Sequence, residues 1–179
     1  MFAITPRLTL RPGWPEDAPA LARAIGQRPV AKNLSSVPWP YALADAESFL
    51  AMPREATDLF LLICSREDDR RPLIGGIGLR PDGDAHVLGY WLTPEAWGRG
   101  YMTEAAGALL AAARGSLRLT RFRACHFVDN PASGRVLAKL GFRPTGRTEP
   151  QPCPTRGGEV EAAVFELDDD EDRAMPLAA

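Results

Sequence analysis

Two short motifs in the second half of the chain combine groups that can hold a phosphate with groups that can donate hydrogen bonds to a ligand. The first is Gly-Arg-Gly-Tyr at 98–101, between a strand-like apolar run at 88–92 and an alanine-rich helical pattern at 102–113. A glycine turn that ends a strand and opens a helix leaves backbone N–H groups free at the positive end of the helix dipole. This arrangement is typical of a phosphate or pyrophosphate site.

The second motif is Asn-Pro-Ala-Ser at 130–133, followed after five residues by Lys-Leu-Gly-Phe at 139–142. Asn130 is a natural helix N-cap, and Pro131 suits the first turn because its missing N–H is not needed there. The Ser133 hydroxyl can bond to the backbone of that turn or to a ligand. The motif therefore predicts a second helix start, and the structural and ligand-binding roles of Asn130 and Ser133 both stay open.

The glycine patterns and the net charge exclude several other kinds of binding site. The pattern at 98–101 is neither Gly-x-Gly-x-x-Gly nor a P-loop with Gly-Lys-Ser/Thr. Gly75, Gly76 and Gly78 precede no helix, so we interpret them as strand or bulge glycines. A formal net charge of −2 gives no electrostatic footprint for nucleic acid and fits a cationic substrate such as an amine.

The elements that must position these motifs are read from hydrophobic periodicity. Strands are predicted at 8–10, 59–65, 73–80, 85–93, 121–128, 142–148 and 160–167. Helices are predicted at 17–27, after Asp45 as N-cap, at 102–113 with Gly115 as its stop, and from Asn130 to Gly141. Proline-rich 27–41 and 150–158 are expected to be irregular. Short charged links between the second, third and fourth strands favour an antiparallel meander. The fold class is therefore α+β, a mixed, mostly antiparallel sheet of about seven strands with helices on both faces.

The cysteines and His126 are interpreted mainly as packed side chains. Cys64, Cys125 and Cys153 are odd in number and widely separated, which favours neither a disulfide framework nor a zinc site. The first two lie in apolar strand patterns and are interpreted as packed thiols, whereas Cys153 is expected in an exposed loop. His126 shares a predicted strand face with Phe122, Ala124 and Val128, which indicates a packed histidine.

The length of the chain and its apolar stretches predict the domain organisation and the localisation. The 179 residues, 19.5 kDa, predict one domain at 1–167 and an acidic, mobile tail at 168–179. The longest apolar stretches fall far short of the roughly 20 residues that span a bilayer, and 1–12 has no signal-peptide core. We therefore expect a cytoplasmic protein that binds neither membrane nor nucleic acid, as a monomer or homodimer.

At its motifs the chain resembles the GNAT-fold N-acetyltransferases, in the RimJ/RimL-like branch that acetylates protein N-termini. The family's acetyl-CoA loop reads Arg/Gln-x-x-Gly-x-Gly/Ala, and here Trp97 and Met102 stand at its ends while both central glycines are kept. The branch phrase Pro-x-x-Trp-Gly-x-Gly-Tyr is matched from Pro94, and 130–142 matches the second signature. The opening strand at 5–11 is also similar, so the likeness runs from about 5 to 167.

The resemblance implies a set of coenzyme contacts. Residues 98–103 would hold the pyrophosphate, and backbone groups near Trp91 and Leu92, exposed by splaying of the sheet, would pair with the pantetheine. Asn130 would contact the pantetheine arm, and Ser133 would lie near the sulfur and assist departure of the thiolate. The implied coenzyme-binding residues are Trp91, Leu92, Trp97, Gly98, Arg99, Gly100, Tyr101, Met102, Thr103, Asn130 and Ser133. The side chains of Arg99, Arg135 and Lys139 are expected mainly on the solvated face, with contact to the coenzyme phosphates as the alternative.

The implied function is transfer of an acetyl group from acetyl-CoA to a primary amine, by direct attack in a ternary complex and without a metal. Glu149 stands near the position where some relatives carry an acidic catalytic residue and is the candidate general base. His126, Glu95, Asp129 and Glu161 stay open for that role. The acceptor, a protein N-terminus or a small-molecule amine, would be lined by 27–41 and 149–158. The alternative is a non-catalytic module of the same fold that senses acyl-CoA.

Overall fold

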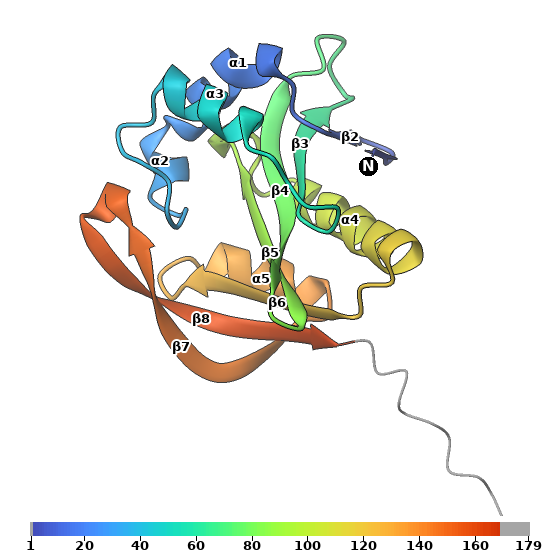
Figure 1. Ribbon diagram of the computed structural model, residues 1–179, viewed down its shortest axis with the longest axis vertical. Coiled ribbons are helices and arrows are strands. Elements are labelled where there is room, and N and C mark those ends of the chain that lie inside the picture. The colour runs from blue at the N-terminus through green and yellow to red at the C-terminus, as the bar shows by residue number, and fades with distance from the viewer. Residues whose placement is uncertain (1, 169–179) are drawn as a thin grey trace, which may run out of the picture.

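Helices cover both faces of a central sheet (Figure 1), and the computed structural model describes residues 2–168. The strands of that part of the chain are β1 (Ala3–Ile4), β2 (Leu8–Arg11), β3 (Leu59–Ser65), β4 (Leu73–Asp82), β5 (Ala85–Leu92), β6 (Arg121–Phe127), β7 (Arg143–Cys153) and β8 (Gly158–Asp168). The helices are α1 (Ala18–Ile25), α2 (Arg28–Ala31), α3 (Leu43–Ala51), α4 (Tyr101–Leu117) and α5 (Pro131–Lys139). Three short 3₁₀ turns are η1 (Pro15–Asp17), η2 (Pro94–Ala96) and η3 (Pro154–Arg156).

The sheet runs in the order β1-β2-β3-β4-β5-β6-β8-β7, and its paired neighbours are antiparallel except for β5 and β6. The predicted α+β class and the meander from β3 to β5 are confirmed. Within residues 2–168 the sheet has one strand more than the seven expected. The additional strand, β1, pairs two residues with β2 and is too short to show a periodic pattern.

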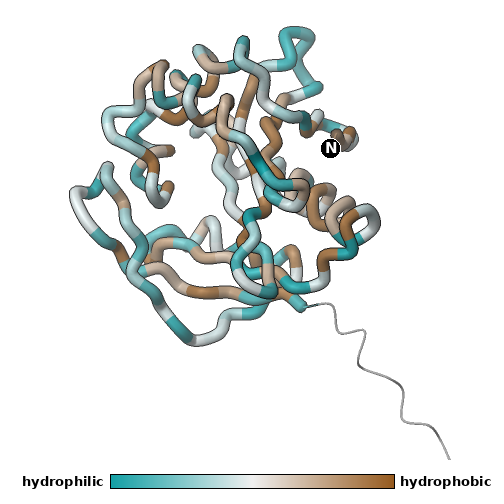
Figure 2. Tube along the Cα trace, in the orientation of Figure 1, coloured by the Kyte–Doolittle hydropathy of each residue, from teal (hydrophilic) through white to brown (hydrophobic). Residues whose placement is uncertain are grey.

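The central strand β3 is apolar from Leu59 to Cys64, since helices bury both of its faces. Leu61 and Ile63 belong to the main core beneath α4, whereas Leu62 on the other face packs against α1 and α3. Figure 2 shows hydrophobic stretches on these inner strands and along α4, and hydrophilic stretches on the connecting loops. The sheet is thus a rigid platform between two helical layers.

The parallel neighbours β5 and β6 diverge halfway along their length. They pair only between residues 86–88 of β5 and 122–124 of β6. Beyond that point β5 continues to pair with β4 as far as Leu92, and β6 continues to pair with β8 as far as Phe127. The sheet therefore splays open between β5 and β6, and backbone groups at the inner edge of β5 face the opening instead of a neighbouring strand.

Several predicted boundaries are wrong for local reasons. The Asp45 carboxylate accepts the Ala42 N–H at 2.7 Å from within α3, so Asp45 is not the N-cap. Helix α4 continues past Gly115 to Leu117, and Arg118 closes it with a φ of +54°. The segment 27–41, expected to be irregular, contains the one-turn helix α2 with Pro29 in its first turn.

The largest correction concerns the β7–β8 hairpin. Residues 150–153, predicted as loop, continue β7 because this strand is at the edge of the sheet, where proline removes no needed N–H. As a result Cys153, expected to be exposed, is buried against Phe127 and Ala162. Strand β6 ends at buried Phe127, so Val128 is exposed and does not share the predicted strand face.

Of the acidic tail predicted at 168–179, the structure describes only the first residue. Asp168 ends β8, and residues 169–179 lie outside the described residues. Among the helices of residues 2–168, none has the length and apolar character needed to cross a membrane.

Candidate active site

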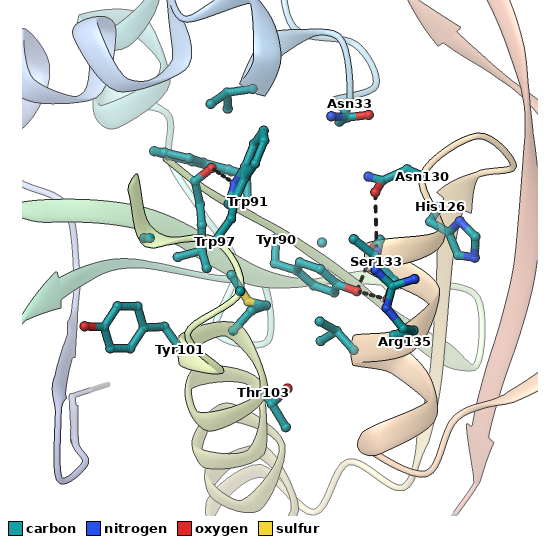
Figure 3. Close-up of a pocket in the computed structure, with 18 of the residues that line it drawn as sticks. Asn33, Tyr90, Trp91, Trp97, Tyr101, Thr103, His126, Asn130, Ser133 and Arg135 are labelled. Carbon is teal, nitrogen blue, oxygen red and sulfur yellow. Dashed lines mark hydrogen bonds between the residues drawn. The ribbon is translucent and has the colours of Figure 1, made fainter. Parts of the chain in front are cut away.

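A pocket of about 350 Å³ lies where β5 and β6 diverge, between the N-terminal ends of α4 and α5. It includes most of the predicted coenzyme residues, and Figure 3 shows side chains from β5, α5 and the α2 segment converging on it. Its lining residues include Leu88, Gly89, Tyr90, Trp91, Leu92, Trp97, Gly98, Gly100, Tyr101, Met102, Thr103, Cys125, His126, Asn130, Ser133, Arg135 and Lys139. The structure therefore brings the two sequence motifs to one site.

The glycine turn before α4 has the backbone that the motif requires. Gly98 and Gly100 have φ values of +73° and +79°, a conformation that side chains disfavour. Gly100 is the N-cap of α4, and no side chain among residues 2–168 caps that end. The N–H groups at 101–103 lack intrahelical acceptors by the geometry of any helix start. They face the pocket together with the positive end of a 17-residue helix.

Two predicted coenzyme residues in this turn have side chains that serve a different purpose. The Tyr101 ring points away from the pocket (Figure 3) and lies between the guanidinium groups of Arg7 and Arg99, at 4.7 and 4.8 Å. Its hydroxyl donates to Glu67, which also pairs with Arg99 at 3.3 Å. Arg99 does not line the pocket. The Arg99 side chain is therefore on the solvated face, as expected, and both residues brace the turn from outside.

The Glu104 carboxylate, in the first turn of α4, is paired with two side chains from the N-terminal segment of the chain. Glu104 accepts from Thr5 Oγ1 at 2.6 Å and from Arg7 Nε at 2.7 Å. Burial alone would raise the pKa of Glu104, but these hydrogen bonds outweigh it and the pKa is lowered. Arg7 also donates to the Arg99 carbonyl at 2.9 Å, which holds the glycine turn in place. A phosphate bound at the N-terminus of α4 would therefore lie near a carboxylate whose charge is already balanced by Arg7.

The inner edge of β5 supplies backbone groups to the pocket. Thr93 N–H donates to the carbonyl of Ile74 in β4 at 2.8 Å. Because hydrogen-bonding direction alternates along an antiparallel strand, the backbone groups of Tyr90 and Leu92 point toward the opening. The Leu92 carbonyl accepts the Trp97 indole N–H at 2.8 Å. Trp97, which replaces the family's usual Arg or Gln, therefore ties the glycine turn to the end of β5.

The start of α5 forms the opposite wall. The Asn130 side chain accepts the Ser133 N–H at 3.4 Å, so the N-cap role predicted for Asn130 is confirmed. Figure 3 shows its amide nitrogen directed toward the pocket. The Ser133 hydroxyl lies 2.8 Å from the Tyr90 hydroxyl, which also donates to the Ser133 carbonyl at 3.0 Å. Burial raises the pKa of Tyr90 to about 12.

The structure does not bring Glu149 into this pocket. It lies on β7, and its carboxylate pairs with Arg123 of β6 at 3.2 Å. Arg123 and Glu149 lie on the opposite sheet face from Phe122 and Ala124, which pack in the core with α4. Among the open alternatives, Asp129 pairs with Arg156, and that hydrogen bond lowers its pKa. Of the candidate bases only His126 lines the pocket.

Of the two segments predicted to line the acceptor site, the α2 segment lines the pocket and the β7–β8 hairpin does not. Pro29, Val30, Asn33 and Leu34 line the pocket, whereas residues 149–158 do not. Arg156 in η3 donates to the Lys32 carbonyl at 2.7 Å and to Asp129 at 2.7 Å. Figure 1 shows the η3 tip of the hairpin reaching toward α2. The hairpin therefore holds the α2 segment in place without lining the pocket itself.

Residues 7–143 match the family described as acetyltransferase (GNAT) domain. The chain belongs to the GNAT acetyltransferase family. The uncharacterized N-acetyltransferase YoaA of Bacillus subtilis (strain 168) is 31% identical over 156 residues, covering 82% of this chain and 86% of that protein. The reaction of this GNAT enzyme is transfer of an acetyl group from acetyl-CoA to an amine.

Solved structures confirm the GNAT fold. The ribosomal-protein-S5-alanine acetyltransferase from Vibrio fischeri is 17% identical with a TM-score of 0.80, covering 97% of this chain and 100% of that one. Mycobacterium smegmatis RimJ in complex with CoA-disulfide is 20% identical with a TM-score of 0.76, covering 93% and 84%. The predicted membership of the GNAT-fold N-acetyltransferases is thus confirmed, and the chain shares its fold with these two acetyltransferases.

Sequence reasoning missed Tyr90 as a pocket residue. Arg135 and Lys139 are exposed, as expected, and they also line the pocket. Tyr90 belongs to an ordinary strand pattern, and its contact with Ser133 joins residues 43 positions apart. The one signal in the sequence was its place beside Trp91, where the sheet was expected to splay.

Proposed function

We propose that this GNAT enzyme, acting through residues 1–167 as one unit, acetylates the α-amino group of a peptide or protein N-terminus. The observation that carries the proposal is the absence of acidic side chains from the pocket. Of the residues in 2–168 that line it, none is Asp or Glu. A strongly basic amine would therefore find no carboxylate there to take its proton.

The acceptor's own pKa decides how much of it can react. An α-amino group has a pKa of about 7.7–8.0, whereas a lysine side chain has a pKa of about 10.4. At pH 7.5 roughly 30% of an α-amine is neutral, against about 0.1% of a lysine amine. This difference of more than two orders of magnitude favours the N-terminal amine in a site without a strong base. Water can then take the proton that the nitrogen loses.

The coenzyme is proposed to bind across the splayed strands. The N–H groups at 101–103 and the Gly98–Gly100 turn would hold the pyrophosphate, and the inner edge of β5 would pair with the pantetheine. Arg135 and Lys139 line the pocket and are placed to attract the phosphates. Proteins of similar fold bind acetyl-CoA or CoA, among them the microcin C7 self immunity acetyltransferase MccE in complex with acetyl-CoA and AMP, and Mycobacterium smegmatis RimJ in complex with CoA-disulfide. No step needs a metal.

The mechanism is direct transfer in a ternary complex. The amine enters past Asn33 and Trp91, and its nitrogen attacks the thioester carbonyl while backbone N–H groups of β5 polarise the carbonyl oxygen. Ser133 faces the leaving sulfur. Proximity contributes much of the acceleration, because both reactants are held in one geometry. Glu149 has no part in this mechanism.

The test compares amines in a thiol-release assay. We expect turnover with a peptide that has a free N-terminus, and far less with the same peptide N-acetylated but carrying a lysine, or with spermidine. The value of kcat/KM should rise with pH through the pKa of the α-amine. A preference for the lysine peptide or spermidine would overturn the acceptor assignment. Tight acetyl-CoA binding without thiol release with any amine would support the non-catalytic module instead.

A further inference from the structure

Tyr90 connects the two walls of the pocket at the point where the sheet no longer does. It is the second residue of β5 beyond the last pair with β6, Leu88 with Ala124. Its side chain reaches α5, where the hydroxyl lies 3.0 Å from the Ser133 carbonyl oxygen and 2.8 Å from Ser133 Oγ. Figure 3 shows the Tyr90 ring lying across the pocket toward Ser133. The reactive part of a bound coenzyme would lie beside this contact.

The two hydrogen bonds allow two arrangements of protons. A carbonyl oxygen only accepts, so in the first arrangement Tyr90 donates to the Ser133 carbonyl and the Ser133 hydroxyl donates to the Tyr90 oxygen. In the second, Tyr90 donates to Ser133 Oγ, and the serine proton is free for another acceptor. Only the second arrangement allows Ser133 to donate to a sulfur atom. The heavy atoms need not move between them.

We propose that Tyr90 is a positioning residue for acetyl transfer, which turns its hydrogen bond from the Ser133 carbonyl to the Ser133 hydroxyl as charge develops on the coenzyme sulfur. This inference rests on the proposed function, because it assumes that the sulfur lies beside Ser133. Tyr90 itself acts through Ser133 and does not touch the sulfur.

The balance of the step limits what the pair can do. The amine lone pair forms the new N–C bond, the electron pair of the C–S bond passes to sulfur, and the nitrogen proton leaves to water. A thiol has a pKa of about 8.5, whereas burial raises the pKa of Tyr90 to about 12. Complete proton transfer from Tyr90 through Ser133 to the thiolate is therefore unfavourable. The pair stabilises the thiolate by hydrogen bonds, and the thiolate later takes its proton from water.

The magnitude follows from this limit. Full general acid catalysis is worth about 10²–10⁴-fold in rate. A charge-assisted hydrogen bond corresponds to roughly 10- to 100-fold. We therefore expect Ser133→Ala and Tyr90→Phe each to lower kcat by roughly 10- to 100-fold, with the KM for acetyl-CoA nearly unchanged. The double variant should be no slower than Ser133→Ala alone, because Tyr90 works through the serine.

The deciding experiment needs no acceptor. CoA is bound to the protein, and thiolate absorbance is titrated with pH against desulfo-CoA as blank. We expect the pKa of the bound thiol to be lower than that of free CoA in the wild type, and to return toward the free value in Tyr90→Phe and Ser133→Ala. Tyr41→Phe is the matched control: burial also raises the pKa of Tyr41 to about 12, but Tyr41 does not line the pocket. It should behave as wild type.

The outcomes separate this inference from the proposed function. A bound thiol pKa that is the same in wild type and folded Tyr90→Phe overturns the role of Tyr90, whatever the turnover. Lowered melting temperature and raised KM with unchanged kcat in Tyr90→Phe would also overturn it, since those mark a structural contact. A Tyr90-dependent thiol pKa in a protein that acetylates no amine leaves the Tyr90 network standing and overturns the proposed acceptor chemistry.

Discussion

Gly134 in α5 lies directly against the imidazole of His126 in β6. A Cβ built on Gly134 would lie 2.6 Å from His126 Nε2, which is closer than real Cβ atoms approach other atoms. His126 Nδ1 lies 2.8 Å from the Phe127 carbonyl, which only accepts, so Nδ1 carries the ring proton. The ring also packs against Phe165 at a centroid distance of 5.3 Å. His126 is therefore fixed in place, and it supports the helix that carries Ser133.

This contact predicts that Gly134→Ala destabilises the protein. In a free helix the change would stabilise by about 1 kcal/mol, but here the new methyl group must push α5 away from the sheet. We expect lower free energy of unfolding and weaker acetyl-CoA binding, measured by denaturant unfolding and calorimetry. Gly107→Ala in α4 is the control, because a Cβ there meets no atom of the described part of the chain within 4 Å. This substitution should stabilise the protein by about 0.5–1 kcal/mol. A Gly134→Ala protein as stable as that control would contradict the packing argument.

The role of His126 also shows which features of the site the sequence could predict. A packed histidine was expected from the alternation of β6, and the structure agrees. Figure 3 shows its ring on the far side of the first turn of α5 from Tyr90. The closeness of Gly134 was not predictable, because it depends on how near α5 approaches the sheet. Periodicity indicates which face is buried, but it does not give the distance between packed elements.

The glycine turn was predictable because its chemistry is local. Positive φ at Gly98 and Gly100, free N–H groups and the following helix all lie within one short segment. The β7 edge was mispredicted for the opposite reason. Pro150 and Pro152 lie in a strand that the sequence reads as loop, since tolerance of proline depends on having no neighbour on one side. Only the complete sheet order reveals that edge.

Gly100→Asp tests the phosphate assignment. The side chain would place a carboxylate at the N-terminus of α4, where it competes with phosphate for the free N–H groups and repels it. We expect acetyl-CoA affinity to fall by several kcal/mol by calorimetry. Gly146→Asp is the matched control, because Gly146 has a similar φ of +76° and lies outside the pocket. A Cβ at Gly146 would meet no atom of the residues that the structure describes within 4 Å. Equal affinity in both variants would remove the turn from the coenzyme site.

The Arg11–Asp17 pair predicts a pH dependence of stability. Asp17 accepts from both terminal nitrogens of Arg11 at 2.6 and 2.7 Å and from Trp14 N–H at 2.8 Å. The Arg11 hydrogen bond lowers the pKa of Asp17. Its contribution is therefore fully present above the unfolded pKa of about 3.9 and is lost as the pH falls through the lower folded pKa.

The corresponding variant is Asp17→Asn, with unfolding measured at several pH values. At pH 7 we expect it to be less stable than wild type by about 1.5–3 kcal/mol, the usual contribution of hydrogen bonds to a charged group. The difference should shrink below pH 4. Glu16→Gln, at the exposed neighbouring position, should show little difference at either pH. A gap between wild type and Asp17→Asn that stays constant from pH 7 to pH 3 would mean that charge is not its source.

Direct transfer predicts that no cysteine carries the acetyl group. Cys125 lines the pocket, but burial raises the pKa of its thiol, and Glu149 raises it further. Little thiolate is therefore present at neutral pH to attack a thioester. Cys64 is buried outside the pocket, and burial raises its pKa as well.

We expect Cys125→Ser to keep most of its turnover, while Cys64→Ser, as the comparison variant, loses stability with its turnover per folded molecule unchanged. Mass spectrometry after mixing wild type with acetyl-CoA alone should find no acetyl-cysteine. An acetylated Cys125 that forms and then decays at the turnover rate when amine is added would replace direct attack with a two-step mechanism.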